Sequence, residues 1–477
     1  MKKYFTLLQI FTAASLMSIS QNVGIGTTTP AEKLHVAGNI KVDTVKPNGI
    51  KFTPNAGTGK MLTSDAAGNA SWQERSAGGG VGFGSWGDCT MNGISEYNPI
   101  ADATGNAGDN FGWSVAISGN FGIVGAPNDA VGTNANQGSA SIYQYNGSNW
   151  VLMQKLTDPT GVATDYFGIS VHISGNYAIV GAYGDAGTFQ DEGSASIYQY
   201  NGSSWVLMQK LTDATGAAFD YFGISVYISG NYAIVGSYSD DAPAVDQGSA
   251  SIYRYDGSSW VLMQKIFDAT GAASDNFGIS VSISGNYAIV GSYLDDAPAA
   301  NQGSVSFYQY DGSSWVLMQK IFDATGIAND QFGDCVSISG NYAIVGAWMD
   351  DNGIIANQGS ASIYQYNGSS WVLMQKIIDV SGSASDQFGV SVSISDDYAI
   401  VGSYFDDIGA NTDQGSVSIY LRVGLEWQKL QFVTDPGGKP LNNFGDAVTI
   451  DGSTKRFLIG ANNYSNLSGK VVFGKVN

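Results

Sequence analysis

The chain has 477 residues with 63 glycines, is 12% aromatic and only 13% charged, and carries a formal net charge of −20. This composition is typical of a β-rich, turn-rich folded protein and not of a disordered one. The negative charge argues against nucleic acids and anionic membranes as partners, because both require a basic surface.

The first twenty residues predict a signal peptide. Lys2 and Lys3 precede an apolar run over Tyr4–Met17, and the small residue Ser20 favours cleavage before Gln21. The run is short for a membrane span, and no later segment is long and apolar enough to be one. We therefore expect a protein that is secreted or displayed at the cell surface, with no membrane span.

Residues 21–75 predict a small β-rich segment, and the glycine-rich residues 76–93 predict a linker. Within the first segment, Asn22–Ile40 and Met61–Gln73 resemble the short β-rich segments of bacterial surface-fibre and phage tail-fibre-like proteins. In such proteins these segments form stalks that are sometimes trimeric. The resemblance therefore implies display or adhesion, and it allows a homotrimer through residues 21–75.

A Phe-Gly dipeptide divides the rest of the chain into similar units. It recurs at intervals of 55 or 56 residues, at Phe111, Phe167, Phe222, Phe277, Phe332, Phe388 and Phe444. Each unit contains short runs rich in Val, Ile, Tyr and Trp, separated by Gly, Asn, Asp and Ser. Four such runs per unit predict propeller blades, so we expect an all-β, seven-bladed β-propeller of four-stranded blades over residues 94–477.

The order of the runs predicts how the ring closes. In six units the outer run begins with Trp and is followed eight residues later by Asp. Before the first Phe-Gly, Ile94 stands eight residues ahead of Asp102, so residues 94–100 predict a seventh outer strand. The last unit, from Phe444, contains only three runs. We expect the N-terminal strand to complete the C-terminal blade and to leave no open edge.

The first unit resembles the FG-GAP repeat, which is also the blade of the integrin α propeller. It contains Phe111-Gly112 and then Gly125-Ala126-Pro127, while the other units keep Phe-Gly and vary the second part. The resemblance covers about residues 94–477 and is strongest to bacterial secreted versions of the repeat. It implies the propeller fold without assigning an activity.

One part of the integrin pattern is missing. There, the connection between the first two strands of several blades is an Asp-x-Asp-x-Asp-Gly loop that holds calcium. Here that connection is only Ser174-Gly175-Asn176, or Ser395-Asp396-Asp397 in the sixth unit. We therefore expect no cofactor, although calcium elsewhere on the acidic face stays open.

Aspartates gather in two kinds of connection that should leave the same face of the ring, because strands alternate in direction within a blade. Adjacent pairs lie between the second and third strands, at Asp240-Asp241, Asp295-Asp296, Asp350-Asp351 and Asp406-Asp407. Single aspartates lie two residues before Phe, at Asp109, Asp165, Asp220, Asp275, Asp330 and Asp386. Such residues either bind turn N–H groups or contact cations and polar ligands.

Aromatic side chains accompany these aspartates. They follow the Gly-Ala or Gly-Ser at the end of the second strand, at Tyr183, Tyr238, Tyr293, Trp348 and Tyr404. Such rings either pack between blades or stack on sugars. The connections around them also vary most in length, as ligand-binding loops on a rigid scaffold do. The candidate ligand-binding residues are Tyr238, Asp240, Asp241, Tyr293, Asp295, Asp296, Trp348, Asp350, Asp351, Tyr404, Asp406 and Asp407.

Residues suited to catalysis are few. The only histidines are His35 and His172, so no histidine triad or metal cluster can form. The only cysteines are Cys89 and Cys335, and both a disulfide and two free thiols stay open. A carboxylate pair of the glycosidase kind would be expected among residues that break the repeat, such as Asp334, Asp446 or Arg254.

The sequence thus predicts a secreted or cell-surface binding and adhesion module that is not an enzyme. Its acidic, aromatic-bearing loop face would contact an extracellular protein or glycan. Two alternatives stay open: a carbohydrate-active enzyme that uses carboxylates on the same face, and a purely structural surface protein.

Overall fold

The computed structural model describes residues 94–477 except 103–104, 242 and 297, and the backbone of four short strands nearer the N-terminus. In that N-terminal part β1 (Val23–Ile25) and β2 (Leu34–Val36) pair in parallel, and β3 (Lys60–Ser64) and β4 (Ala70–Glu74) form an antiparallel pair. The predicted signal peptide and linker, with Cys89, lie outside the described residues. No described helix is long and apolar enough to cross a membrane.

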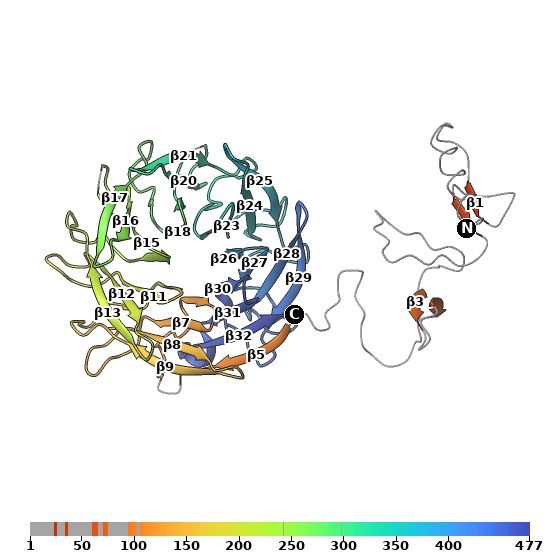
Figure 1. Ribbon diagram of the computed structural model, residues 1–477, viewed down its shortest axis with the longest axis horizontal. Coiled ribbons are helices and arrows are strands. Elements are labelled where there is room, and N and C mark those ends of the chain that lie inside the picture. The colour runs from red at the N-terminus through yellow and green to blue at the C-terminus, as the bar shows by residue number, and fades with distance from the viewer. Residues whose placement is uncertain are drawn as a thin grey trace, which may run out of the picture. The chain divides into compact units, whose positions relative to one another are not determined.

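From β5 onwards the chain forms seven four-stranded antiparallel sheets arranged in a ring (Figure 1). Blades 1 to 3 consist of β6 (Val115–Ser118), β7 (Phe121–Ala126), β8 (Ser139–Tyr145) and β9 (Trp150–Leu156); β10 (Val171–Ser174), β11 (Tyr177–Ala182), β12 (Ser194–Tyr200) and β13 (Trp205–Leu211); and β14 (Ser225–Ser229), β15 (Tyr232–Ser237), β16 (Ser249–Tyr255) and β17 (Trp260–Ile266).

Blades 4 to 6 consist of β18 (Ser280–Ser284), β19 (Tyr287–Ser292), β20 (Ser304–Tyr310) and β21 (Trp315–Ile321); β22 (Val336–Ser339), β23 (Tyr342–Ala347), β24 (Ser360–Tyr366) and β25 (Trp371–Ile377); and β26 (Phe388–Ser395), β27 (Tyr398–Ser403), β28 (Ser416–Val423) and β29 (Glu426–Thr434). Blade 7 consists of β30 (Phe444–Asp451), β31 (Arg456–Ala461), β32 (Lys470–Val476) and β5 (Ile94–Ile100). A single-turn helix, α2 (Tyr464–Leu467), lies between β31 and β32.

The ring closes as the sequence predicts. Strand β5 pairs antiparallel with β32, in a register that places Val471 opposite Ile100 and Val476 opposite Ile94. The first strand of the propeller is therefore the outer strand of the last blade, and the two ends of the repeat array share one sheet (Figure 1).

Each Phe-Gly dipeptide packs at the boundary between two blades. Phe167 is fully buried in a core cluster that joins Ile142 of blade 1 to Val180 of blade 2. A glycine at the start of the third strand makes the close approach that this requires. At Gly193 φ is +89°, and a Cβ atom would lie 2.1 Å from the carbonyl oxygen of Phe222 in the next blade. Buried and exposed residues hardly alternate along the inner strands, because neighbouring blades cover both faces of each sheet.

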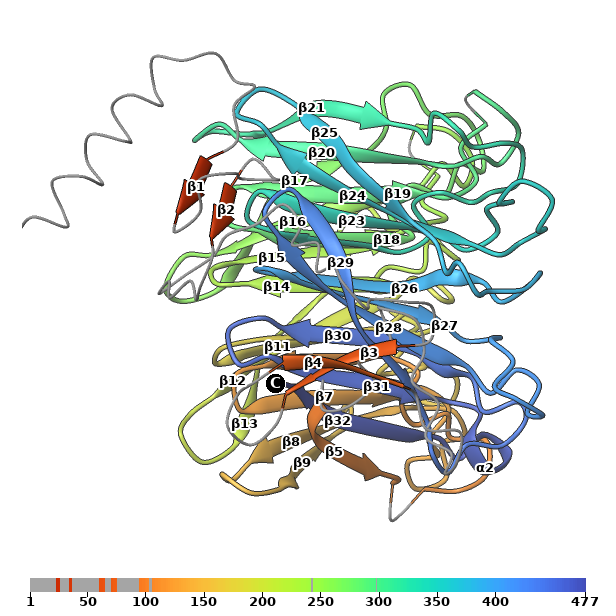
Figure 2. The same cartoon turned by 90° about the vertical axis from the view of Figure 1, so that its right-hand side faces the viewer.

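The two rims of the ring differ. At one rim, two-residue turns such as Gly175-Asn176 join the first and second strands, between β10 and β11. At the other rim emerge the longer connections from second to third strand, the links between blades, and α2 (Figure 2). We call these the tight-turn face and the loop face.

Candidate functional site

On the loop face, a lysine from the outer strand joins two aspartates from different connections. In blade 2, Lys210 Nζ lies 2.7 Å from Asp158 Oδ2 in the preceding inter-blade link, and it also contacts Asp185 in the β11–β12 connection. The Ser194 hydroxyl donates to Asp185 at 2.6 Å. The two kinds of connection thus meet on one face and are held together by an ammonium group.

The same arrangement recurs around the ring. Lysines of five blades each contact an aspartate of the preceding link and one of the second-to-third-strand connection: Lys155 with Asp102 and Asp129, Lys210 with Asp158 and Asp185, Lys265 with Asp213 and Asp240, Lys320 with Asp268 and Asp295, and Lys376 with Asp323 and Asp350. Burial and these contacts make the aspartates part of the scaffold.

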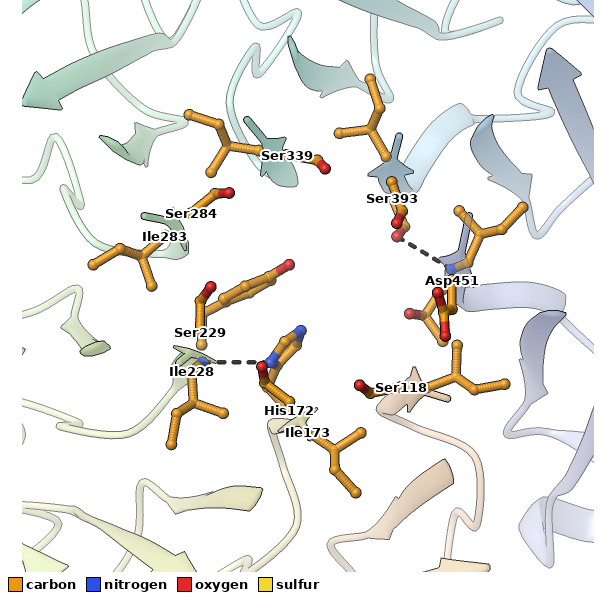
Figure 3. A pocket seen from close by; sticks show the side chains of 18 residues that line it. Ser118, His172, Ile173, Ile228, Ser229, Ile283, Ser284, Ser339, Ser393 and Asp451 are labelled. Carbon is orange, nitrogen blue, oxygen red and sulfur yellow. Dashed lines mark hydrogen bonds between the residues drawn. The ribbon is translucent and has the colours of Figure 1, made fainter. Parts of the chain in front are cut away.

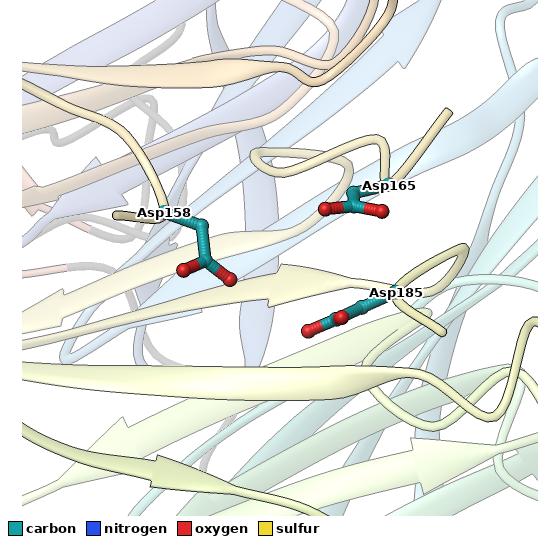
Figure 4. A group of neighbouring side chains, drawn as sticks. All are labelled: Asp158, Asp165 and Asp185. Carbon is teal, nitrogen blue, oxygen red and sulfur yellow. The ribbon is translucent and has the colours of Figure 1, made fainter. Parts of the chain in front are cut away.

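A third carboxylate approaches each cluster. Figure 4 shows Asp158, Asp165 and Asp185 turned toward one another, with one oxygen of each within 4.8 Å of the others. Asp165 Oδ2 accepts the Val162 N–H at 2.6 Å, and burial raises the Asp165 pKa to about 6. Equivalent triads are Asp213, Asp220 and Asp240, and Asp268, Asp275 and Asp295. Their spacing would suit a cation, but the lysine ammonium already supplies positive charge there.

The predicted aspartate pairs divide into two roles. The first members Asp240, Asp295 and Asp350 are at most 3% exposed and bind the lysines. They are not surface ligands, which corrects the prediction of an exposed acidic contact at these positions. Asp406, their equivalent in blade 6, is partly buried.

The second members of the pairs lie further out and organise their own loops. Each accepts a backbone N–H from the far side of the connection, as Asp296 does from Asn301 at 2.9 Å. The other three accept in the same way: Asp241 from Asp246, Asp351 from Asn357, and Asp407 from Asp413. Asp241, Asp296 and Asp407 stay exposed, so an oxygen of each remains open to solvent.

Four tyrosines form a continuous row across blades 2 and 3 on the loop face. Tyr166 stacks on Tyr183 with ring centroids 5.0 Å apart and an interplanar angle of 1°. Tyr183 meets Tyr221 edge to face at 5.5 Å, and Tyr221 stacks on Tyr238 at 5.3 Å and 11°. All four rings are only partly buried. We call Tyr166, Tyr183, Tyr221 and Tyr238 the tyrosine row.

Two members of the tyrosine row were missed by sequence reasoning. Tyr166 and Tyr221 immediately precede Phe-Gly, at a position that is Asn or Gln in the other five units. Both have φ of +56°, a left-handed conformation that bulky residues seldom adopt. Sidechains held in this conformation are often functional. The replacement of Asn or Gln by Tyr in two consecutive units is the sequence feature that could have identified them.

The remaining predicted aromatic residues lie on the same face in blades 4 to 6. Burial raises the pKa of Tyr293, with a further effect from Asp334, and it raises the Tyr404 pKa to about 12, with Asp446 and Asp334 adding to it. The indole N–H of Trp348 is buried and has no partner among the described residues. These rings do not continue the stacked row of blades 2 and 3.

The three residues that break the repeat do not form one site. Asp334 and Asp446 lie near the loop-face ends of inner strands, and burial raises the pKa of each to about 7. Arg254 lies at the tight-turn end of β16, in a groove with Tyr177 and Asn231. Cys335 is a free thiol whose Sγ accepts the Val392 N–H at 3.3 Å.

A comparison with protein families places this ring in a known group. The FG-GAP repeat model matches residues 96–143, 150–198, 205–253, 260–308, 315–364 and 371–420, which together are more than half of the chain. The chain belongs to the FG-GAP repeat family. A search of curated proteins finds no match.

Each FG-GAP match begins in an outer strand and ends in the third strand of the next blade, so it spans a blade boundary. The matches end at residue 420, in β28, and the structure shows that β30, β31 and β32 together with β5 build a seventh blade. Propellers of this family serve as binding or structural modules, and no curated relative narrows that further for this chain.

Proposed function

We propose that this FG-GAP propeller is a secreted or cell-surface adhesion module that binds an extracellular glycan through the tyrosine row. Partly exposed, mutually stacked rings offer flat apolar surfaces to the C–H faces of sugars. Asp191 and Asp246 lie close enough to the row to raise the pKa of Tyr221, after the larger effect of burial. Their carboxylates would accept hydrogen bonds from sugar hydroxyls.

The stacked tyrosine row is the observation that carries this proposal. Ordinary packing between blades is already provided by the buried Phe-Gly dipeptides and outer-strand tryptophans. The row adds aromatic surface where solvent reaches it, next to the exposed Phe219, whose ring lies 6.3 Å from Tyr221. Placement on loops held by buried ion pairs would keep such a surface preorganised.

The N-terminal part completes the proposed arrangement. Residues 1–20 would direct export, and residues 21–75 would form a stalk, which could be trimeric. A stalk that presents several propellers would strengthen weak glycan contacts through multivalency.

A screen of the full chain on an array of glycans and extracellular matrix proteins tests this function. Saturable binding to glycans is expected. Binding to proteins alone would reassign the ligand, and binding to neither would favour a purely structural role. Product analysis of soluble oligosaccharides in the same screen tests the enzymatic alternative. The raised pKa values of Asp334 and Asp446 favour that alternative, because a general acid must hold its proton near neutral pH.

A further inference from the structure

The central channel contains a cavity at its tight-turn end, away from the tyrosine row. Its volume is about 190 Å³, and all seven blades contribute to its lining. Figure 3 shows serine side chains such as Ser118 and Ser284 directed toward this space, with Ile173, Ile228 and Ile283 turned away from it. The volume corresponds to about six water molecules at roughly 30 Å³ each, so it would hold one small molecule and not a chain.

Two blades break the repeat at the channel. One inner-strand position holds a small residue in five blades, as Ala116, Ser282, Ser337, Ser393 and Thr449, and the last two of these line the cavity. Blades 2 and 3 instead carry His172 and Tyr227, whose ring centroids lie 3.5 Å apart with an interplanar angle of 24°. One side of the channel is therefore a stacked pair of rings.

Both rings are held in place. His172 Nδ1 accepts the Ile228 N–H at 3.4 Å, and burial lowers the His172 pKa to about 3. The imidazole is therefore neutral, with its proton on Nε2. The Tyr227 side chain is hydrogen-bonded to Ser282 and Ser337, so it extends from blade 3 to blades 4 and 5.

The rest of the lining consists mainly of an isoleucine from each blade and of hydroxyl groups, and the orientation of several hydroxyls is set by the neighbouring blade. Ser393 Oγ accepts the Ile450 N–H at 3.3 Å, Ser395 Oγ accepts the Gly452 N–H at 3.0 Å, and Ser118 Oγ accepts the Gly175 N–H at 3.1 Å. Each of these oxygens still has a proton to donate. The lining beyond the two rings thus offers several hydroxyl donors.

Charge narrows the class of ligand. Asp451 is the one acidic or basic side chain other than neutral His172 among the residues that line the cavity. It accepts bonds from the Gly119 N–H at 2.6 Å and from Ser453 and Thr454, and these donors lower its pKa despite its burial. A fixed negative charge disfavours anions, and one carboxylate with its donors in place is a poor cation site.

We propose that this cavity binds a single neutral sugar, with one face of the sugar ring on the His172–Tyr227 pair and its hydroxyls against the serine wall. The site is separate from the tyrosine row and does not depend on the function proposed for it.

Titration of the full chain with neutral monosaccharides tests the site, with glucose, galactose, mannose and N-acetylglucosamine compared with glucuronate and glucosamine by ligand-observed NMR. At least one neutral sugar should bind saturably, with ring protons shifted upfield by the aromatic pair. Tyr227→Ser and His172→Ser each introduce serine, which occupies the equivalent position in other blades as Ser282 and Ser337. Each change should weaken binding at least tenfold. Ser369→Ala, in an exposed turn of the same face, should not.

Three results would overturn the proposal. One is the absence of saturable binding of any neutral sugar to the unaltered chain, which needs no variant to fold. Another is preferential binding of glucuronate or glucosamine. The third is unchanged binding in folded Tyr227→Ser and His172→Ser chains. Variants of Tyr166 or Tyr221 should leave this binding intact, so failure here is distinguishable from failure of the loop-face function.

Discussion

Lys470 forms with Asp435 in blade 7 the ion pair that an outer-strand lysine forms in blades 1 to 5. The outer strand β5 carries Pro99 at the lysine position, and Lys470 extends from β32 instead, where other blades have serine. Tyr464 replaces the second aspartate, with its ring centroid 4.4 Å from Lys470 Nζ. Retention of a cation after three substitutions indicates that it stabilises the junction between blades.

Removing one of these lysines should therefore destabilise the ring. Lys320→Met leaves Asp268 and Asp295 buried without a cation, and we expect it to lower the free energy of unfolding by about 3–5 kcal/mol. Lys429→Met is the matched control, because its Nζ lies 3.7 Å from Asp379 and the side chain is more exposed. Its expected cost is below about 1 kcal/mol. Chemical denaturation measures both, and equal losses would contradict the assigned role.

The third carboxylates predict an unusual dependence of stability on pH. Burial raises the pKa of four of them to about 6, namely Asp165, Asp220, Asp330 and Asp386. Since these acids bind protons more tightly in the folded state, their contribution to stability is lost as the pH rises from about 4 to about 6. His172 acts in the opposite direction because burial lowers its pKa, whereas Asp334 and Asp446, whose pKa burial raises to about 7, act in the same direction as these four acids.

Thermal melting at about pH 5 and about pH 8 checks this, with the lower melting temperature expected at the higher pH. Asp165→Asn mimics the neutral acid and should raise the melting temperature at the higher pH, narrowing the difference. Asp256→Asn is the control, because Asp256 is exposed and turn N–H groups lower its pKa to about 2. A melting temperature that rises toward alkaline pH would show that ionising these acids in the folded protein costs little free energy.

Closure of the ring by β5 predicts sensitivity to truncation. A chain that begins at Asp102 lacks β5 and exposes β32 as an unpaired edge. Loss of several ladder hydrogen bonds at about 1 kcal/mol each should lower the melting temperature by roughly 10 °C. A chain that begins at Ser85 is the control and should melt like the full chain. Equal melting of the two truncated chains would mean that β5 contributes little to closure.

The ring is expected to fold without calcium. The two-residue turns, such as Gly175-Asn176, provide no integrin-type loop, and lysines supply the charge in the acidic clusters. Addition of a chelator should therefore shift the melting temperature little. A shift of several degrees that calcium reverses would instead locate ions at triads such as Asp158, Asp165 and Asp185.

The fold was predictable because the repeat fixes it. The Phe-Gly period gave the blade count, and the spacing between Ile94 and Asp102 gave the closing strand, although that strand shares little sequence with the others. Both features follow from the spacing of repeated residues along the chain, and this spacing can be read from a single sequence.

The site was predictable only in part. The sequence located the aspartates on one face but not that Asp240, Asp295 and Asp350 are buried, because their lysine partners lie on a different strand. A lysine recurs three residues before the aspartate of each of these links, and this regular spacing in the sequence could have indicated the ion pairs. The stacking of Tyr166 and Tyr183 depends on how two connections meet in space, which spacing alone does not show.

Binding by the tyrosine row is tested most directly on the glycan array with a Tyr166→Asn/Tyr221→Asn chain. Asparagine occupies this position in three other blades with the same left-handed backbone, so the variant should fold normally. At about 0.5–1.5 kcal/mol per ring, glycan affinity should fall roughly tenfold. An Asn341→Ser/Ser369→Ala chain, altered on the tight-turn face, should bind as the unaltered chain does. Unchanged binding in the tyrosine variant, or loss only in the tight-turn variant, would contradict the assignment of the ligand-binding face.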